Sequence, residues 1–211
     1  MTGMKKIASP EPDRLAPALG RPFLLSVAGD GSNCGKTRLV TLLLAAAARR
    51  GRVGALKVST STPDHRCART GLACGCLRFE GQMRFLEGEE YTRRRGKDTF
   101  AYHEAGAHRV AWLQTTSDFA AEAGAEAARE LASFDVDLVV VEGAALARAG
   151  RTDALVLVRR EDRPEKAGFS ELLPRADLVL ASRRGGGEGT FDPDGAELPS
   201  GLESLLDRIF A

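Results

Sequence analysis

The chain has 211 residues, with 30 Lys and Arg against 29 Asp and Glu, so its formal net charge is +1. This balance argues against a general electrostatic grip on nucleic acid or on an anionic membrane. Hydrophobic residues make up 43% of the chain and charged residues 28%, which are ordinary values for a globular protein. The longest apolar stretch, residues 42–48, is far shorter than the roughly 20 residues of a membrane-spanning helix. We therefore expect a cytosolic protein without a membrane segment.

The first twenty residues are rich in proline and charge, which predicts a flexible tail. We expect residues 21–211 to form a single domain. Apolar runs of strand length follow without polar alternation, which indicates strands covered on both faces and a mostly parallel sheet. These runs are residues 23–28, 53–58, 137–142, 154–158 and 177–181.

Helical patterns alternate with these strands. One apolar face predicts a helix over 36–50, and Ser117 is expected to cap a second helix over 118–133. Ser200 and Glu203 have the spacing of a capping box ahead of a last helix. Strands alternating with helices predict a three-layer α/β fold.

A glycine-rich segment follows the first strand. Residues 29–37 read Gly-Asp-Gly-Ser-Asn-Cys-Gly-Lys-Thr and stand between an expected strand and an expected helix, which is the context of a phosphate-binding loop. We expect Lys36 to reach the β and γ phosphates and Thr37 to hold Mg²⁺ through its hydroxyl. The other residues expected to contact the nucleotide are Gly31, Ser32, Asn33, Cys34 and Gly35.

This loop departs from the pattern GxxxxGK[ST] at its first position, where the chain carries Asp30. A carboxylate beside phosphates repels them. Asp30 must therefore point away from the phosphates or contact the metal or the base. The alternative for the whole segment is a tight turn that binds no ligand.

Glu142 ends an expected strand and precedes Gly143, at the edge where open α/β sheets place their ligands. We expect it to hold Mg²⁺ through water or to orient the attacking water. The alternative is a solvent-facing residue that only ends the strand.

Several segments, taken in order, resemble MobB, the family of P-loop proteins of molybdopterin-guanine dinucleotide biosynthesis. They are Ser-Asn-Cys-Gly-Lys-Thr at 32–37, Arg-Val-Gly-Ala-Leu-Lys at 52–57, Gly-Lys-Asp-Thr at 96–99 with Glu-Ala-Gly-Ala at 104–107, and Val-Val-Val-Glu-Gly at 139–143. The resemblance implies a P-loop NTPase fold that binds GTP, usually dimerises and assists a nucleotidyltransferase. It also implies that Lys36 and Thr37 bind phosphates and Mg²⁺, with Lys57 and Asp98 near that site.

The chain departs from this family in two places, and so resembles a divergent member or a paralogue that serves another metal cofactor. Val-Ser-Thr-Ser follows Lys57 where a histidine-rich stretch is usual, and an inserted loop subdomain containing cysteines is expected over 63–97. The sequence does not indicate which nucleotide base the site would prefer. Ala-Ser-Arg at 181–183 stands where many GTPases carry Asn-Lys-x-Asp, so both GTP and ATP remain open.

The insertion contains His65, Cys67, Cys74 and Cys76 as a His-x-Cys pair and a Cys-x-Cys pair. Two such pairs can converge on one ion, and three thiolates with one imidazole suit tetrahedral Zn²⁺. An iron–sulfur cluster held by the cysteines is one alternative. Ordinary cytosolic thiols without metal are another.

Three functions fit these patterns. The first is an accessory protein that hydrolyses GTP or ATP slowly during metal-cofactor assembly, as a homodimer beside a biosynthetic enzyme, with Lys36, Glu142 and Asp98 as its catalytic residues. The second is a small-molecule kinase in which residues 63–97 form a substrate lid and the arginines at 93–95 neutralise the transferred phosphate. The third is a metal carrier with a vestigial phosphate loop. Nucleotide binding separates the first two functions from the third.

Overall fold

The computed structural model describes residues 20–61, 81–160, 162, 168–186 and 190–211. These residues form one eight-stranded sheet in the order β3-β4-β2-β5-β1-β6-β7-β8. Neighbouring strands run parallel, except that β3 runs antiparallel to β4. The strands are β1 Phe23–Gly29, β2 Val53–Ser61, β3 Met83–Leu86, β4 Arg109–Thr116, β5 Leu138–Glu142, β6 Ala154–Arg160, β7 Leu178–Ser182 and β8 Thr190–Phe191.

Helices cover both faces of this sheet. The α-helices are α1 Lys36–Ala47, α2 Glu89–Thr92, α3 Asp98–Glu104, α4 Ala120–Leu131, α5 Ala145–Arg148 and α6 Ser200–Ile209, and a short 3-10 helix, η3, spans Leu173–Arg175. On one face, α1, α3 and α6 pack against alternate residues of β1 such as Phe23 and Val27. On the other face, α4 and α5 pack against Leu24 and Leu56. The expected three-layer α/β fold with a mostly parallel sheet is confirmed.

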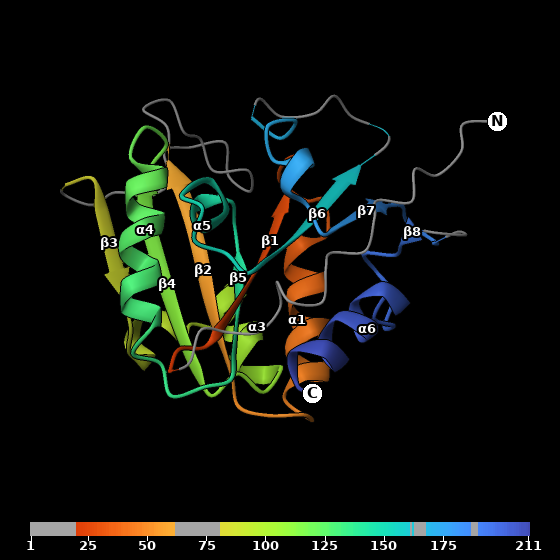
Figure 1. Cartoon of the computed structure of the whole chain (residues 1–211), viewed down its shortest axis with the longest axis horizontal. Coiled ribbons are helices and arrows are strands. Elements are labelled where there is room, and N and C mark those ends of the chain that lie inside the picture. The colour runs from red at the N-terminus through yellow and green to blue at the C-terminus, as the bar shows by residue number, and fades with distance from the viewer. Residues whose placement is uncertain (1–19, 62–80, 161, 163–167, 187–189) are drawn as a thin grey trace.

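The strand β5, at the centre of the sheet, is buried along its whole length. Every residue of β5 is buried, because this strand has a neighbour on each side and helices on each face. The arrowheads of β1 and β6 point to the top of the view in Figure 1, so the carboxyl ends of these parallel strands meet at one edge of the sheet. No helix among the described residues is long and apolar enough to cross a membrane.

The amino ends of the parallel strands are joined by aspartates. One aspartate directly precedes each of β5, β6 and β7, and its carboxylate accepts a backbone N–H from the start of a neighbouring strand. These hydrogen bonds are Arg52 N to Asp137 at 2.7 Å, Leu24 N to Asp153 at 2.8 Å and Leu155 N to Asp177 at 2.7 Å. They satisfy backbone donors that the parallel ladder leaves unpaired at that edge.

The two expected helix caps are wrong. The N-cap of α4 is Phe119, and the Ser117 hydroxyl donates to Asp118 Oδ1 at 3.3 Å rather than capping the helix. The N-cap of α6 is Pro199, whose carbonyl accepts the Leu202 N–H at 2.8 Å. Ser200 therefore already lies inside the helix, where its side chain cannot form a capping box.

Part of the segment expected to be an insertion belongs to the sheet. Within residues 63–97, the structure describes 81–97, which contain the edge strand β3 and the short helix α2. The strand β3 pairs with β4, which was itself not among the expected strands. Gln114 and Thr115 interrupt the apolar run of β4, yet both are buried, and the Thr115 hydroxyl donates to Gln82 O at 3.2 Å.

Candidate functional site

The segment 30–35 joins β1 to α1 and needs glycine at its last position. Gly35 has a φ of 91°, in the left-handed region that glycine adopts without strain. A Cβ on Gly35 would also lie 2.9 Å from both Phe191 Cε1 and Pro193 Cβ. Conformation and packing together explain why glycine precedes Lys36.

Cys34 lies beneath the loop. Its side chain is 1% exposed, and its Sγ donates to Gly31 O at 3.4 Å. A Cβ on Gly29 would collide with this sulfur, so Gly29 makes room for it. The Cys34 side chain is thus packed in the core. The predicted contact with the nucleotide would therefore be made by the backbone of Cys34.

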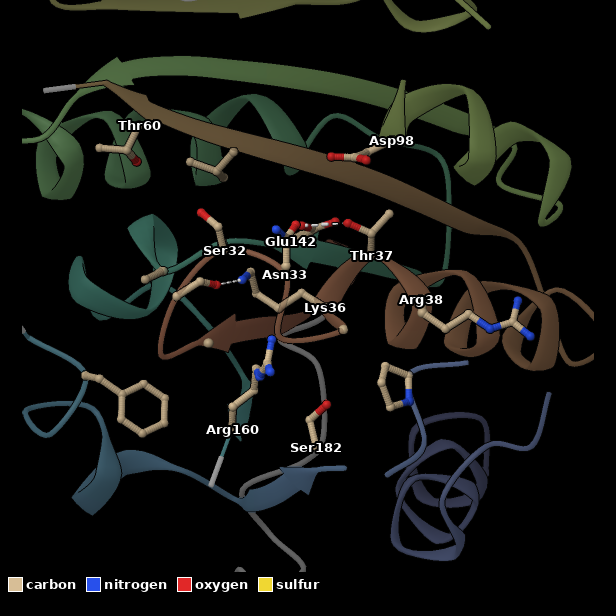
Figure 2. Close-up of a pocket in the computed structure, with 18 of the residues that line it drawn as sticks. Ser32, Asn33, Lys36, Thr37, Arg38, Thr60, Asp98, Glu142, Arg160 and Ser182 are labelled. Carbon is tan, nitrogen blue, oxygen red and sulfur yellow. Dashed lines mark hydrogen bonds between the residues drawn. The ribbon is translucent and has the colours of Figure 1, made fainter. Parts of the chain in front are cut away.

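A pocket of about 1220 Å³ opens over this loop at the carboxyl edge of the sheet (Figure 2). Its lining includes six of the predicted loop residues, Gly31, Ser32, Asn33, Gly35, Lys36 and Thr37. Basic side chains outnumber acidic ones in the lining: Lys36, Arg38, Lys57, Arg148, Arg160, Arg183 and Arg184 against Asp98, Glu142, Asp162 and Asp194. This excess of positive charge suits an anionic ligand.

Lys36 is the first residue of α1. Its Nζ donates to Gly31 O and lies 3.2 Å from Cys34 Sγ. The ammonium is thereby held over the loop at the N-terminus of a twelve-residue helix. The helix dipole and the ammonium add their positive potentials at this point.

Glu142 is 3% exposed, so it is not a solvent-facing strand end. Its Oε1 accepts hydrogen bonds from Thr37 Oγ1 at 3.1 Å and from Lys57 Nζ at 2.5 Å. Its Oε2 accepts a hydrogen bond from the Tyr102 hydroxyl. A buried carboxylate requires such partners, because desolvation without them costs several kcal/mol.

Lys57 links two carboxylates. Besides Glu142, its Nζ binds Asp98 Oδ2 at 2.7 Å. Burial lowers the pKa of Lys57, but the charges of Glu142 and Asp98 and the hydrogen bonds to both outweigh burial and raise it above its ordinary value. The side chain therefore remains an ammonium, and it brings Asp98 of α3 into the same cluster as Glu142 and Thr37.

Sequence reasoning missed Tyr102. This residue is 0% exposed and lies one turn after Asp98 on α3. Burial and then the charge of Glu142 raise the pKa of Tyr102 well above its ordinary value, so its hydroxyl keeps the proton that it donates. The spacing of four between Asp98 and Tyr102 places both on one helix face, which is the signal that could have found it.

Asp30 points away from the pocket. It is 6% exposed and lies outside the pocket lining. Its Oδ2 accepts the backbone N–H of Arg160 at 2.6 Å, and its own N–H donates to Val158 O at 3.1 Å. The carboxylate is thus bound to β6 and does not face the space over the loop.

The predicted cysteine site lies outside the described residues, because His65, Cys67, Cys74 and Cys76 all fall within 62–80. In the described part of the chain, no group of three or more His, Cys, Asp and Glu side chains is arranged to hold a metal ion. The zinc or iron–sulfur site stays a prediction.

No family model and no curated protein matches this chain. The solved structures that are similar to it include the following two. The kinase domain of Escherichia coli tyrosine kinase ETK is 15% identical, with a TM-score of 0.39 over 78% of this chain and 68% of that one. A Borrelia burgdorferi B31 protein described as a plasmid partition protein and bound to AMPPNP is 9% identical, with a TM-score of 0.41 over 89% of this chain and 81% of that one. Similarity at this level carries no argument about function.

Proposed function

We propose that this protein binds a nucleoside triphosphate with Mg²⁺ over residues 30–35 and hydrolyses it slowly. The observation that carries the proposal is the hydrogen bond of 3.1 Å between Thr37 Oγ1 and Glu142 Oε1. It joins a hydroxyl at the start of α1 to a carboxylate at the end of β5, beside the Lys36 ammonium (Figure 2). The sequence patterns predict a role in nucleotide or Mg²⁺ binding for all three residues, Lys36, Thr37 and Glu142.

The residues present fit a polyphosphate and a magnesium ion. Glycine at position 35 keeps the loop backbone free of a Cβ, and the α1 N-terminus offers N–H groups to an anion. Hydroxyl and carboxylate oxygens are the ligands that Mg²⁺ takes in proteins. Lys36 would bind phosphate oxygens, while Thr37 and Glu142 would hold the ion directly or through water. When bound, the ion neutralises phosphate charge.

The chain's own residues supply the remaining chemistry. Glu142 is the group that orients an attacking water, since it is a buried carboxylate in direct contact with Thr37. Tyr102 and Lys57 keep its two oxygens in place through their hydrogen bonds. Asp98 is the second candidate for the water, through its ion pair with Lys57.

Two observations argue against a kinase that uses the arginines at 93–95 to neutralise the transferred phosphate. The arginines at 93–95, expected to neutralise phosphate in a kinase, are all absent from the pocket lining. Arg93 Nε instead forms an ion pair with Glu89 Oε1 at 2.7 Å, four residues earlier in the chain.

Calorimetric titration with GTP and with ATP, each with Mg²⁺, tests the proposal. We expect wild-type protein to bind at least one nucleotide and Lys36→Ala to lose binding without loss of helical circular dichroism. The matched control is Arg49→Ala, which removes one positive charge from the exposed turn just after α1 and should bind like wild type. Unchanged affinity in Lys36→Ala, or no binding by wild type, would remove the assignment.

Thr37→Ala separates the metal from the phosphates. We expect this variant to bind nucleotide in EDTA about as well as wild type does, but to lose most of the gain in affinity that Mg²⁺ gives. An equal loss with and without Mg²⁺ would contradict a metal role for Thr37.

We further propose, on the sequence resemblance to MobB alone, that the nucleotide serves the assembly of a molybdopterin-type or other metal cofactor. The partners would be a second copy of the chain and a biosynthetic enzyme. Sedimentation with and without nucleotide tests the dimer. Metal analysis of anaerobically purified protein tests the cysteine site: colourless protein with one zinc per chain supports zinc, a brown protein supports the cluster, and metal-free protein contradicts both.

A further inference from the structure

The start of the phosphate loop is fastened to the end of β6. The strands β1 and β6 pair in parallel up to Gly29 and Val158, and the next two hydrogen bonds belong to Asp30. Its backbone N–H donates to Val158 O, and its carboxylate accepts the Arg160 N–H at 2.6 Å. An aspartate at this position, where the common loop pattern has glycine, therefore fixes the backbone of Arg160 relative to the loop.

The Arg160 side chain belongs to the pocket. Successive residues of a strand point to opposite faces, and of the two neighbours Arg159 and Arg160 only Arg160 lies in the pocket lining. Figure 2 shows its side chain extending toward the loop that carries Lys36. The side chain is 25% exposed, so a ligand in the pocket could reach it.

Asp162 orients this guanidinium without covering it. Asp162 Oδ1 accepts from Arg160 Nε at 2.8 Å, and Asp162 Oδ2 accepts from Nη2. A guanidinium has five N–H donors in one plane, so it can keep this ion pair and still bind phosphate oxygens. The Asp30 carboxylate is buried against β6, where it accepts the Arg160 N–H and lies outside the pocket lining.

We propose that Arg160 is a further phosphate-binding residue of the pocket, and that Asp30 is the positioning residue that holds it beside the loop. This inference rests on the proposed nucleotide binding. It assigns to Asp30 a role opposite to the repulsion expected of a carboxylate in a phosphate loop.

Substitution of Asp30 distinguishes a carboxylate that positions Arg160 from one that repels the phosphates. Asp30→Gly restores the common loop pattern but removes the acceptor for the Arg160 N–H, so we expect affinity for AMPPNP or GMPPNP with Mg²⁺ to fall severalfold. Asp30→Asn keeps an oxygen acceptor and should stay close to wild type. If the carboxylate instead repels phosphate, both variants will bind more tightly than wild type, and the proposal is overturned.

Arg160 is tested with its neighbour as a matched control. Arg160→Ala should weaken binding of the same analogues by roughly tenfold or more, the loss expected for a charge-assisted hydrogen bond to phosphate. Arg159→Ala makes the same change in net charge from an exposed position outside the pocket lining and should bind like wild type. Wild-type affinity in Arg160→Ala, or equal losses in both variants, would overturn the proposal.

A double variant and the wild type complete the test. If Asp30 acts through Arg160, then Asp30→Gly with Arg160→Ala should bind no more weakly than Arg160→Ala alone. Additive losses would show that Asp30 does not act through Arg160. Wild-type protein that binds neither analogue contradicts the proposed function itself, whereas normal binding by wild type and by all variants contradicts this inference alone.

Discussion

Glu142 illustrates how one buried residue can join the parts of a site. Its two carboxylate oxygens accept hydrogen bonds from Thr37 of α1, Lys57 of β2 and Tyr102 of α3. Each donor comes from a different element, so the position of the carboxylate depends on the whole carboxyl edge of the sheet. Such preorganised charge is effective in catalysis because it needs no rearrangement during the reaction.

We expect Glu142→Gln to bind nucleotide and Mg²⁺ while losing most hydrolysis. The amide keeps the shape of the side chain but removes the charge that orients water, and a loss on the order of 10²- to 10³-fold in phosphate release is expected. Phosphate release under single-turnover conditions, alongside calorimetric affinity, measures both effects. If turnover survives in Glu142→Gln and disappears in Asp98→Asn, the two carboxylates have the opposite roles.

The sequence predicted the parts of this site that follow local patterns. Lys36 and Thr37 stand directly after a glycine at the start of a helix, and Glu142 ends an apolar run, so spacing alone indicated them. Tyr102 and Arg160 were not predicted, because the contacts that matter are to residues 40 and 130 positions away. The packing of α3 on the sheet brings Tyr102 to Glu142, and the pairing of β1 with β6 brings Asp30 to Arg160.

At the scale of elements, α4 and α5 pack closely at Gly124. A Cβ on this residue would collide with the backbone carbonyl of Ala145, the first residue of α5. Gly201 in α6 has more room, since a Cβ there would lie 3.5 Å from Leu178 Cδ2, an ordinary contact. Two helical glycines thus differ in what surrounds them.

This difference predicts opposite effects of one substitution. Gly124→Ala should lower the free energy of unfolding by about 1–3 kcal/mol, because overpacking forces the two helices apart. Gly201→Ala should raise it by about 0.4–1 kcal/mol, since alanine restricts the unfolded chain and favours the helix. Urea unfolding of both variants measures the effects. Stabilisation by Gly124→Ala would mean that the two helices do not pack so closely in solution.

Most of the strands that the sequence predicted share one property: helices cover both of their faces. The continuous apolar runs of β1, β5 and most of β6 reflect burial on both faces of the sheet, and such runs can be recognised from residue types alone. The N-caps Phe119 and Pro199 were not predicted, because serine is a common cap but backbone geometry decides whether it is used. The strand β4 contains buried polar residues whose partners lie on β3, and no local pattern records that pairing.

At the scale of the whole molecule, the buried cluster links stability to pH. The pKa of Tyr102 and that of Lys57 are both raised above their ordinary values of 10.0 and 10.5. The folded state therefore holds these protons more tightly than the unfolded state does. Their contribution to stability is complete below pH 10 and is lost as the pH rises above that value.

We expect the free energy of unfolding to fall between pH 10 and pH 11, by at most about 1.4 kcal/mol per pH unit for each group. Tyr102→Phe should make this dependence shallower, because one of the two groups is removed. Tyr91→Phe, at the chain's other tyrosine, should leave the dependence unchanged. Urea unfolding across this pH range measures the slopes, and equal slopes in wild type and Tyr102→Phe would contradict the role of Tyr102.

The aspartates at the amino ends of β5, β6 and β7 have a consequence for how such a chain can change over generations. They fasten the strands to one another at the edge opposite the pocket, through Arg52, Leu24 and Leu155. Loops at the carboxyl edge can then be exchanged or lengthened without removing these ties. Changes to those loops, whether by evolution or by design, would therefore alter which ligand binds and leave the hydrogen bonds that hold the strands together in place.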